Sequence, residues 1–204
     1  AGAVVVDATG HRFADEGLGG IALVNAIARL DDPLCAVVVF DADAWEDAKS
    51  ADIVPPNPSL IENGGTLVQA ESLEELAGRA GINRTALLET VAAHNDAIVH
   101  DAFEDMQPSR TTSNFEAKSI KNAPFRAIPL CAGITVTMGG IAVDGAARVV
   151  RSDDTPIVGL YAAGSCVGGI EGGPRAGYVG GLIKAFLLGL VAAESAAGMI
   201  SERG

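Results

Sequence analysis

The chain has 204 residues, of which 49% are hydrophobic and 20% charged, a composition typical of a globular protein with one domain or two small ones. Its formal net charge of -12 argues against a nucleic-acid surface, because phosphate binding requires clustered Lys and Arg. We therefore expect no nucleic acid among the partners of this protein.

The amino-terminal part predicts a mixture of strands and helices. The segment AVVVDATGHRF at 3–13 predicts a hairpin, because a turn separates two extended pieces. A helix over about 20–30 follows, and then AVVVF at 36–40 has the β-branched character of a buried strand. Asp41 or Asp43 is placed to cap a short helix that runs to about residue 50. The proline-rich segment that comes next, 52–65, predicts a connection without a long regular element.

A pair of helices is predicted after this connection. Ser72 and Glu75 have the spacing of a capping box, Gly81 ends the first helix, and Asn83 can cap the second. The residues expected on one face of the second helix are Leu87, Leu88, Val91, Ala92, Asn95 and Ile98. We interpret His94 as a structural or solvated residue, since lone histidines on helices are seldom catalytic.

The carboxyl-terminal part begins near Gly133 with GITVTMGGIAVDGAARVV, which predicts a β-meander. Pro156 and Gly159 precede a buried extended segment, which leads into a glycine-rich passage and then into the apolar helix LIKAFLLGLVAAESAA. The apolar stretch from Leu182 to Ala193 is interrupted by Lys184 and is shorter than the roughly 20 residues of a bilayer span. The sequence therefore predicts a buried helix and no membrane span.

The glycine-rich passage from Gly159 to Gly181 predicts a site for a large anionic ring cofactor. Its glycines lack Cβ atoms where a ligand must approach the backbone, and the helix that starts at about Gly181 offers the positive end of its dipole. However, the chain has no G-x-G-x-x-G after an early strand and no acidic ribose ligand about 20 residues later. It cannot build a complete dinucleotide-binding fold by itself.

The cysteine count favours a reducing compartment. Cys35, Cys131 and Cys166 lack metal-ligand spacing, and an odd number of cysteines favours free thiols over a disulfide framework. We interpret them as small buried hydrophobic residues. The start AGAVVVDATG does not read as a signal peptide, so a cytoplasmic location is expected.

Three motifs occur in order in the carboxyl-terminal part: TMGGIAVD at 137–144, PIVGLYAAG at 156–164 and GGIEGGPRAG at 168–177. Together they resemble the carboxyl-terminal part of the fumarate reductase and succinate dehydrogenase flavoprotein family. Upstream, HRFADE at 11–16 is similar to the RF-x-[DN]-E element of that family, and the helix pair resembles one in its capping domain. The resemblance is strongest to the soluble bacterial branch, which includes fumarate and urocanate reductases and the related ketosteroid dehydrogenases.

The resemblance implies a specific fold and cofactor. Residues 1–133 would form most of an α+β substrate-capping domain, and 134–204 would form the carboxyl-terminal segment of an α/β, Rossmann-type, glutathione-reductase-like FAD-binding domain. The amino-terminal FAD-binding half would have to come from elsewhere, as a missing part or a partner chain. The residues implied to contact FAD are Gly139, Gly140, Ala163, Gly164, Ser165, Gly177, Val179, Gly180 and Gly181.

The resemblance also implies an oxidoreductase that exchanges hydride between FAD and a carbon-carbon bond next to a carboxylate or carbonyl. Arg175 matches the arginine that clamps a substrate carboxylate in the family, and a structural ion pair is its alternative role. Tyr178 could take part in a proton step, or its ring could pack on the flavin or in the core. No metal site is expected.

Several positions depart from the family pattern. Gly20 stands where fumarate reductases have a proton-donating arginine, and Thr135 and Val136 stand where they have a histidine pair. Ser165 replaces the usual acidic residue after the A-A-G turn. Two alternatives therefore stay open: an enzyme like the ketosteroid dehydrogenases, or an inactive fragment or module that needs a dinucleotide-binding partner.

Overall fold

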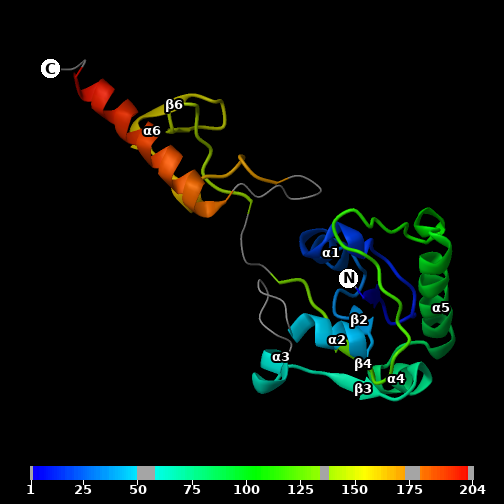
Figure 1. Cartoon of the computed structure of the whole chain (residues 1–204). Helices are drawn as coiled ribbons and strands as arrows, with labels where there is room; N and C mark the ends of the chain where they lie inside the picture. Colours follow the sequence, from blue (N-terminus) through cyan, green and yellow to red (C-terminus); the bar gives the residue numbers. More distant parts are fainter. Residues whose placement is uncertain (1, 50–57, 134–137, 173–179, 202–204) are drawn as a thin grey trace. The chain divides into compact units, whose positions relative to one another are not determined.

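The computed structural model describes residues 2–49, 58–133, 138–172 and 180–201, and the fold is mixed α/β. The chain divides into two compact units, Ala1–Gly133 and Ile134–Gly204. Each unit has its own sheet, and the helices and strands of both can be followed along the chain in Figure 1.

The first unit is built on a four-stranded antiparallel sheet in the order β1-β2-β4-β3. The strands are β1 (Ala3–Val6), β2 (Val37–Phe40), β3 (Val68–Ala70) and β4 (Phe125–Pro129). The predicted hairpin exists only in part, because β1 is followed by a single bridge between Val6 and Arg12. The true partner of β1 is the predicted buried strand β2, with Val5 opposite Val38.

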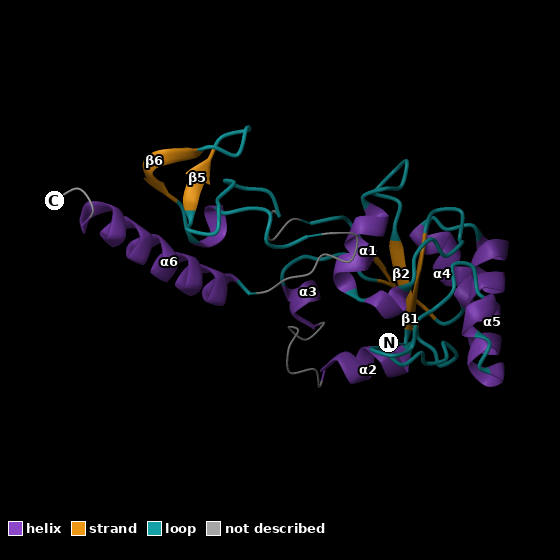
Figure 2. Cartoon of the chain, turned by 90° about the horizontal axis from the view of Figure 1, so that it is seen from above, coloured by secondary structure: helices purple, strands orange, loops and turns teal. Residues whose placement is uncertain are grey.

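The two faces of this sheet are covered by different helices, which Figure 2 shows around β1 and β2. Val37 and Val39 of β2 pack in a core with Leu76 of α4 (Leu73–Ala80) and Leu87 of α5 (Arg84–His100). Because side chains alternate along a strand, Phe40 lies on the other face. There its ring stacks on that of Trp45 in α2 (Ala42–Lys49), with 6.0 Å between the centroids.

The remaining elements of this unit are short. They are η1 (Glu16–Leu18), α1 (Gly20–Ile27), α3 (Pro58–Glu62) and η2 (Phe103–Asp105). The described part of the proline-rich connection therefore contains only the five-residue helix α3.

The predicted helix caps are present. Ser72 Oγ accepts from Glu75 N at 3.2 Å, Gly81 is left-handed after α4, and Asn83 Oδ1 accepts from Ala86 N at 3.1 Å. Asp41 rather than Asp43 begins α2, with Oδ1 3.1 Å from Ala44 N. These caps depend on residues within three positions of each other, which is why sequence spacing predicts them.

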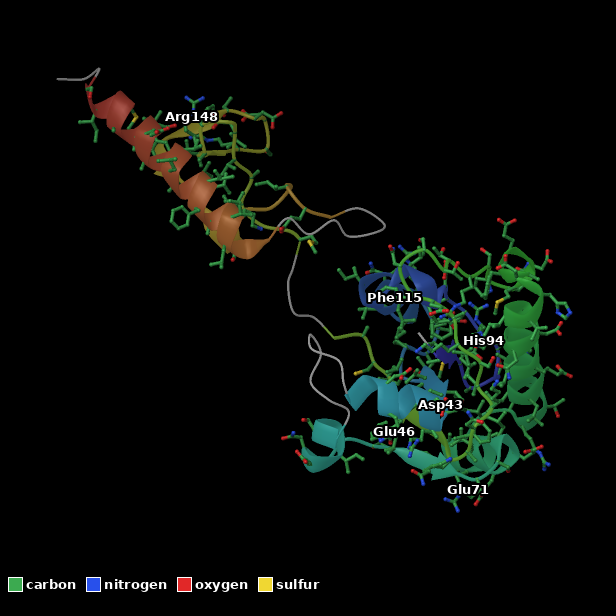
Figure 3. The ribbon with its side chains drawn as sticks, in the orientation of Figure 1. Asp43, Glu46, Glu71, His94, Phe115 and Arg148 are labelled. Atoms are coloured by element: carbon green, nitrogen blue, oxygen red, sulfur yellow. The ribbon has the colours of Figure 1, made fainter. Side chains whose placement is uncertain are left out.

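The buried face of α5 differs from the prediction, and it includes Ala86 and Ala97, which were not predicted. Ala92 is exposed, and His94 is fully buried instead. His94 Nε2 lies 3.0 Å from Lys118 O, a carbonyl acceptor, so this nitrogen carries the proton. Figure 3 labels His94 in the first unit. Its structural interpretation agrees with this bond, which ties α5 to the segment before β4.

A buried ion cluster explains the HRFADE motif. Arg12 holds Glu16 with two hydrogen bonds, Nε to Oε1 at 3.0 Å and Nη2 to Oε2 at 2.6 Å. Arg110 Nη1 adds a bond of 3.0 Å to Oε2, and Val5 N donates to Oε1 at 2.9 Å. Burial acts to raise the pKa of Glu16, but Arg12 and the Val5 amide outweigh it and hold this pKa below its usual value. The cluster joins β1, η1 and the segment that follows η2.

The second unit is small. Its antiparallel pair is β5 (Arg148–Val150) and β6 (Pro156–Tyr161), followed by η3 (Gly164–Cys166) and α6 (Gly181–Ser201). Single bridges join Ile141 to Val167 and Val143 to Val149. The first part of the predicted meander, 134–137, lies outside the described residues. Among the described residues of this unit, Val149, Ala162 and Val167 form a buried core with Val143, Ile157 and Leu188 packed against it, and Ala147 is also buried.

Two expectations of burial in this unit are wrong. Leu160, in the extended segment after Gly159, is 46% exposed, and Leu182 and Phe186 of α6 are 87% and 82% exposed. The helix is also longer than predicted, 21 residues, and by length and composition alone it could cross a membrane. A single helix of this kind is weak evidence for a span. These side chains are exposed because the small core of this unit has too few residues to cover both β6 and α6.

The cysteines are free thiols, but they are less buried than expected. Cys35 is half-buried, whereas Cys131 and Cys166 are exposed. Cys166 Sγ lies 3.1 Å from Ala163 O, inside the turn that ends β6.

Candidate functional site

The candidate site lies within the second unit, where two glycine-containing segments run side by side. Ile141 N donates to Cys166 O at 2.7 Å, and Gly168 N donates to Ile141 O at 3.1 Å. A Cβ on Gly140 would stand 2.5 Å from Cys166 O and 2.6 Å from Gly168 N. Gly140 therefore has a packing reason to be glycine, whereas Gly139, beside it, faces open space.

The A-A-G turn after β6 positions three of the predicted cofactor contacts. Ala163 is extended and precedes η3, Gly164 is left-handed with φ 77°, and Ser165 is exposed. A Cβ on Gly164 would meet Ala185 Cβ at 3.6 Å, so the turn packs on α6 near its start, at the fifth residue of the helix. Because Gly164 has positive φ, a side chain here would be strained whatever the space.

The start of α6 is the second half of the site. Gly180, at φ 100°, turns the chain into the helix, which begins at Gly181, and Lys184 N donates to Gly180 O at 3.2 Å. The amide groups of a first helical turn point out of the helix and carry the positive end of its dipole. The predicted helix start at about Gly181 is therefore confirmed.

A buried ion pair connects α6 with the glycine-rich passage. Lys184 Nζ lies 2.8 Å from Glu171 Oε2, and the two side chains are 7% and 2% exposed. The pair joins the segment after Gly168 to the first turn of the helix, next to the A-A-G turn. Sequence reasoning missed it, because it treated Lys184 only as an interruption of an apolar stretch.

The structure brings together only part of the predicted set. Gly139, Gly140, Ala163, Gly164, Ser165, Gly180 and Gly181 all belong to the described part of the second unit. The proposed catalytic residues Arg175 and Tyr178, and the cofactor contacts Gly177 and Val179, lie outside the described residues, as do Thr135 and Val136. Gly20 belongs to the first unit, where it is exposed at the start of α1.

Comparison with known proteins decides the family. A family model described as an FAD binding domain matches residues 1–178. The chain belongs to the fumarate reductase and succinate dehydrogenase flavoprotein family. It is 35% identical over 197 residues to an NADH:acrylate oxidoreductase of Vibrio harveyi, a match that covers 97% of this chain and 19% of that protein. It is also 35% identical over 176 residues to an NADH:fumarate oxidoreductase of Klebsiella pneumoniae (strain 342), covering 86% of this chain and 18% of the relative.

A solved dehydrogenase also has a similar structure. The 3-ketosteroid-delta4-(5alpha)-dehydrogenase of Rhodococcus jostii RHA1, in complex with 4-androstene-3,17-dione, has a TM-score of 0.68 and 25% identity to this chain. That match covers 96% of this chain and 38% of the other. The chain therefore spans about a fifth of the two flavoprotein relatives named above and under two-fifths of this one.

FAD is the cofactor of this family, and the described residues fit it. Gly139 leaves open space beside the backbone, Ser165 is exposed after a left-handed glycine, and the first turn of α6 favours negative charge. The backbone at these three places would hold FAD. When bound, FAD supplies the group that accepts or donates hydride, and the protein supplies orientation and electrostatics.

Proposed function

We propose that this chain is the substrate-capping part and the carboxyl-terminal, flavin-facing part of an FAD-dependent oxidoreductase. Residues 1–133 form most of the cap, and 134–204 form the last segment of the Rossmann-type FAD-binding domain. The reaction adds hydride from the flavin to one carbon of a double bond next to a carboxylate or carbonyl and a proton to the other carbon, or runs in reverse. We also propose a cytoplasmic location, which the three free cysteines support.

One observation carries this proposal. The A-A-G turn at Ala162–Gly164 packs on α6 near its start, at Ala185, so a left-handed glycine and a helix amino terminus lie near each other. An anionic ring gains from both features, because the glycine permits close approach and the helix dipole stabilises charge. The names of the two 35% identical relatives, an acrylate and a fumarate oxidoreductase, support the substrate class.

The exposed apolar surface of α6 supports the proposal that another part of the enzyme packs against the second unit. Leu182, Phe186 and Leu190 follow one another at intervals of four along α6, and all three are exposed. Exposed contiguous apolar surface of this kind marks an interaction site. We propose that the dinucleotide-binding part of the enzyme covers it, whether it belongs to the same polypeptide or to a partner chain. Below, the intact protein means this chain together with that part.

Two residues are proposed to act on the substrate. Arg175 clamps a substrate carboxylate, because a planar guanidinium binds a carboxylate with two hydrogen bonds. Tyr178 serves as proton donor or acceptor at a substrate carbonyl. Gly20 offers no proton donor at the position where the family pattern has one, so fumarate itself is a poorer candidate than a carbonyl or another unsaturated acid.

The second candidate function is a dehydrogenase of ketosteroid type. The fold match to the Rhodococcus enzyme over 96% of this chain and the tyrosine in the glycine-rich passage favour it. A ketosteroid such as 4-androstene-3,17-dione has no carboxylate, so this function does not need Arg175 as a clamp.

Steady-state kinetics of the intact protein test both candidates. Fumarate, acrylate and a 3-ketosteroid are compared as substrates for the wild type and for Arg175→Ala, Arg175→Lys and Tyr178→Phe. The proposal predicts that Arg175→Ala lowers kcat/KM for the carboxylate at least 100-fold, a loss typical of a charged substrate contact, and that Arg175→Lys loses less. An unchanged kcat/KM in Arg175→Ala would show that Arg175 does not clamp the substrate carboxylate. Turnover of the ketosteroid alone, sensitive to Tyr178→Phe, would establish the second candidate.

A further inference from the structure

The burial pattern of α6 is the reverse of what its composition predicts. Among the described residues of this helix, Lys184 alone is buried, whereas Leu182, Ile183 and Phe186 around it are exposed. Lysine is almost never fully buried unless it is paired. The first turn of α6 therefore directs a cation, and not an apolar side chain, toward the glycine-rich passage.

The position of this cation on the helix is electrostatically unfavourable. Lys184 is the fourth residue of α6, where the positive end of the helix dipole repels an ammonium group. A buried ion pair is also weak evidence for stability, because an apolar pair of similar volume often does as well or better. The bond to Glu171, at 2.8 Å, makes the burial tolerable but gives no reason for it.

An interaction of Lys184 with the cofactor would explain why this lysine is buried. Side chains of a helix lean toward its amino terminus, so the Lys184 ammonium lies over the turn that begins at Gly181. Ala185, the residue after Lys184, packs on Gly164. The cation and the dipole of α6 thus act on one place, which the proposed function assigns to the flavin ring.

We propose that Lys184 is a positioning residue that makes reduced FAD bind more tightly relative to oxidised FAD, and that Glu171 holds the ammonium in place and partly offsets its charge. The inference rests on the proposed function. On reduction, the neutral isoalloxazine ring of FAD would take up two electrons and one proton and so gain one negative charge, which a nearby fixed cation would favour. In the intact protein the electrons come from the enzyme's own donor; in the test below they come from dithionite.

The test is the midpoint potential of FAD in the intact holoenzyme, measured by reductive titration against a reference dye. Four proteins are compared: wild type, Lys184→Met, Lys184→Arg and Glu171→Gln. Lys184→Met should lower the potential and Glu171→Gln should raise it, while Lys184→Arg stays near the wild type. A tenfold change in the ratio of the affinities for reduced and oxidised FAD equals about 30 mV for a two-electron couple. Lys184→Met and Glu171→Gln should each shift the potential by at least that amount.

A purely structural ion pair predicts a different result. Breaking it from either side would loosen the same segment, so Lys184→Met and Glu171→Gln would both weaken FAD binding and would not shift the potential in opposite directions. Shifts of the same sign, or none, overturn the inference. If Lys184→Met does not fold, Glu171→Gln alone decides, because only the proposed role predicts a higher potential. An intact protein that binds no FAD would instead contradict the proposed function itself.

Discussion

Glycines with opposite surroundings occur in the two units. A Cβ on Gly140 would collide with backbone atoms of Cys166 and Gly168, whereas Gly78, inside α4, has no atom within 4 Å of such a Cβ. Backbone atoms of a paired segment cannot move aside as the end of a side chain can. The two positions therefore predict opposite effects of the same substitution.

Gly140→Ala should destabilise the second unit by about 2 kcal/mol, a typical cost of overpacking. Gly78→Ala should stabilise the first unit by about 0.5–1 kcal/mol, because alanine loses less entropy than glycine on entering a helix. Hydrogen exchange resolves the two units, with β5 and β6 reporting on one and α4 on the other. Unaltered exchange of β5 and β6 in Gly140→Ala would show that the close approach to Cys166 does not exist.

Two buried groups of the first unit titrate in a way that makes it sensitive to acid. Burial lowers the pKa of His94 from 6.5, and Arg110 adds to the effect, although the Lys118 carbonyl opposes it. The unfolded state then binds a proton more readily than the folded state, so stability falls as the pH drops from about 6.5 toward the lowered pKa. The pKa of Glu16 is also lowered, and its contribution is present above the unfolded value of about 4.5 and is lost only below it.

We therefore predict that the free energy of unfolding of the first unit falls between pH 7.5 and 5.5 and that His94 causes most of this fall. Urea unfolding followed by the fluorescence of Trp45, the single tryptophan, measures it. The matched variant His94→Gln can still donate to Lys118 O but does not titrate. Its unfolding free energy should be nearly independent of pH over this range, and a slope equal to that of the wild type would contradict the role of His94.

At the scale of elements, local signals were sufficient for some features and not for others. The caps Ser72, Asn83 and Asp41 were predictable because a cap bonds to an amide two or three residues away. The A-A-G turn and the start of α6 were predictable for the same reason. The Arg12–Glu16–Arg110 cluster was not, since Arg110 reaches Glu16 across 94 residues of chain. The ion pair between Lys184 and Glu171 was not predictable either, because the glycine-rich passage between them has no helical or strand periodicity that would place the two side chains together.

The sequence also does not predict that the apolar side chains of α6 are exposed. An apolar helix predicts a buried helix, but burial depends on what surrounds it, and the second unit offers only a small core. The apolar pattern therefore predicts a buried helix, and the structure shows a helix with Leu182, Phe186 and Leu190 exposed. The catalytic assignments of Arg175 and Tyr178 stay predictions.

The exposed face of α6 should make this chain self-associate when it is alone. Phe186→Ser together with Leu190→Ser should reduce association of the isolated chain, because both residues lie on that face. Val99→Ser is the matched control, since Val99 is an equally exposed apolar residue on α5. Light scattering coupled to size-exclusion chromatography measures the mass. Equal masses for the wild type and the double variant would show that this face does not associate.

At the scale of the whole molecule, the two units differ in how complete they are. The first has a four-stranded sheet with helices on both faces, a buried ion cluster and one continuous core. In its described residues, the second has two strands, a long exposed helix and a small core, yet it carries the described part of the proposed cofactor site. We expect the first unit to be stable alone and the second to depend on the dinucleotide-binding part.

The FAD content of the purified protein tests this account most directly. The intact protein and residues 1–204 alone are purified in the same buffer, and FAD is quantified by visible absorbance and by release on denaturation. The account predicts about one FAD per intact protein, as expected for a dinucleotide-binding fold, and a colourless isolated chain. A yellow isolated chain with bound FAD would contradict the claim that this site is one half of a larger one.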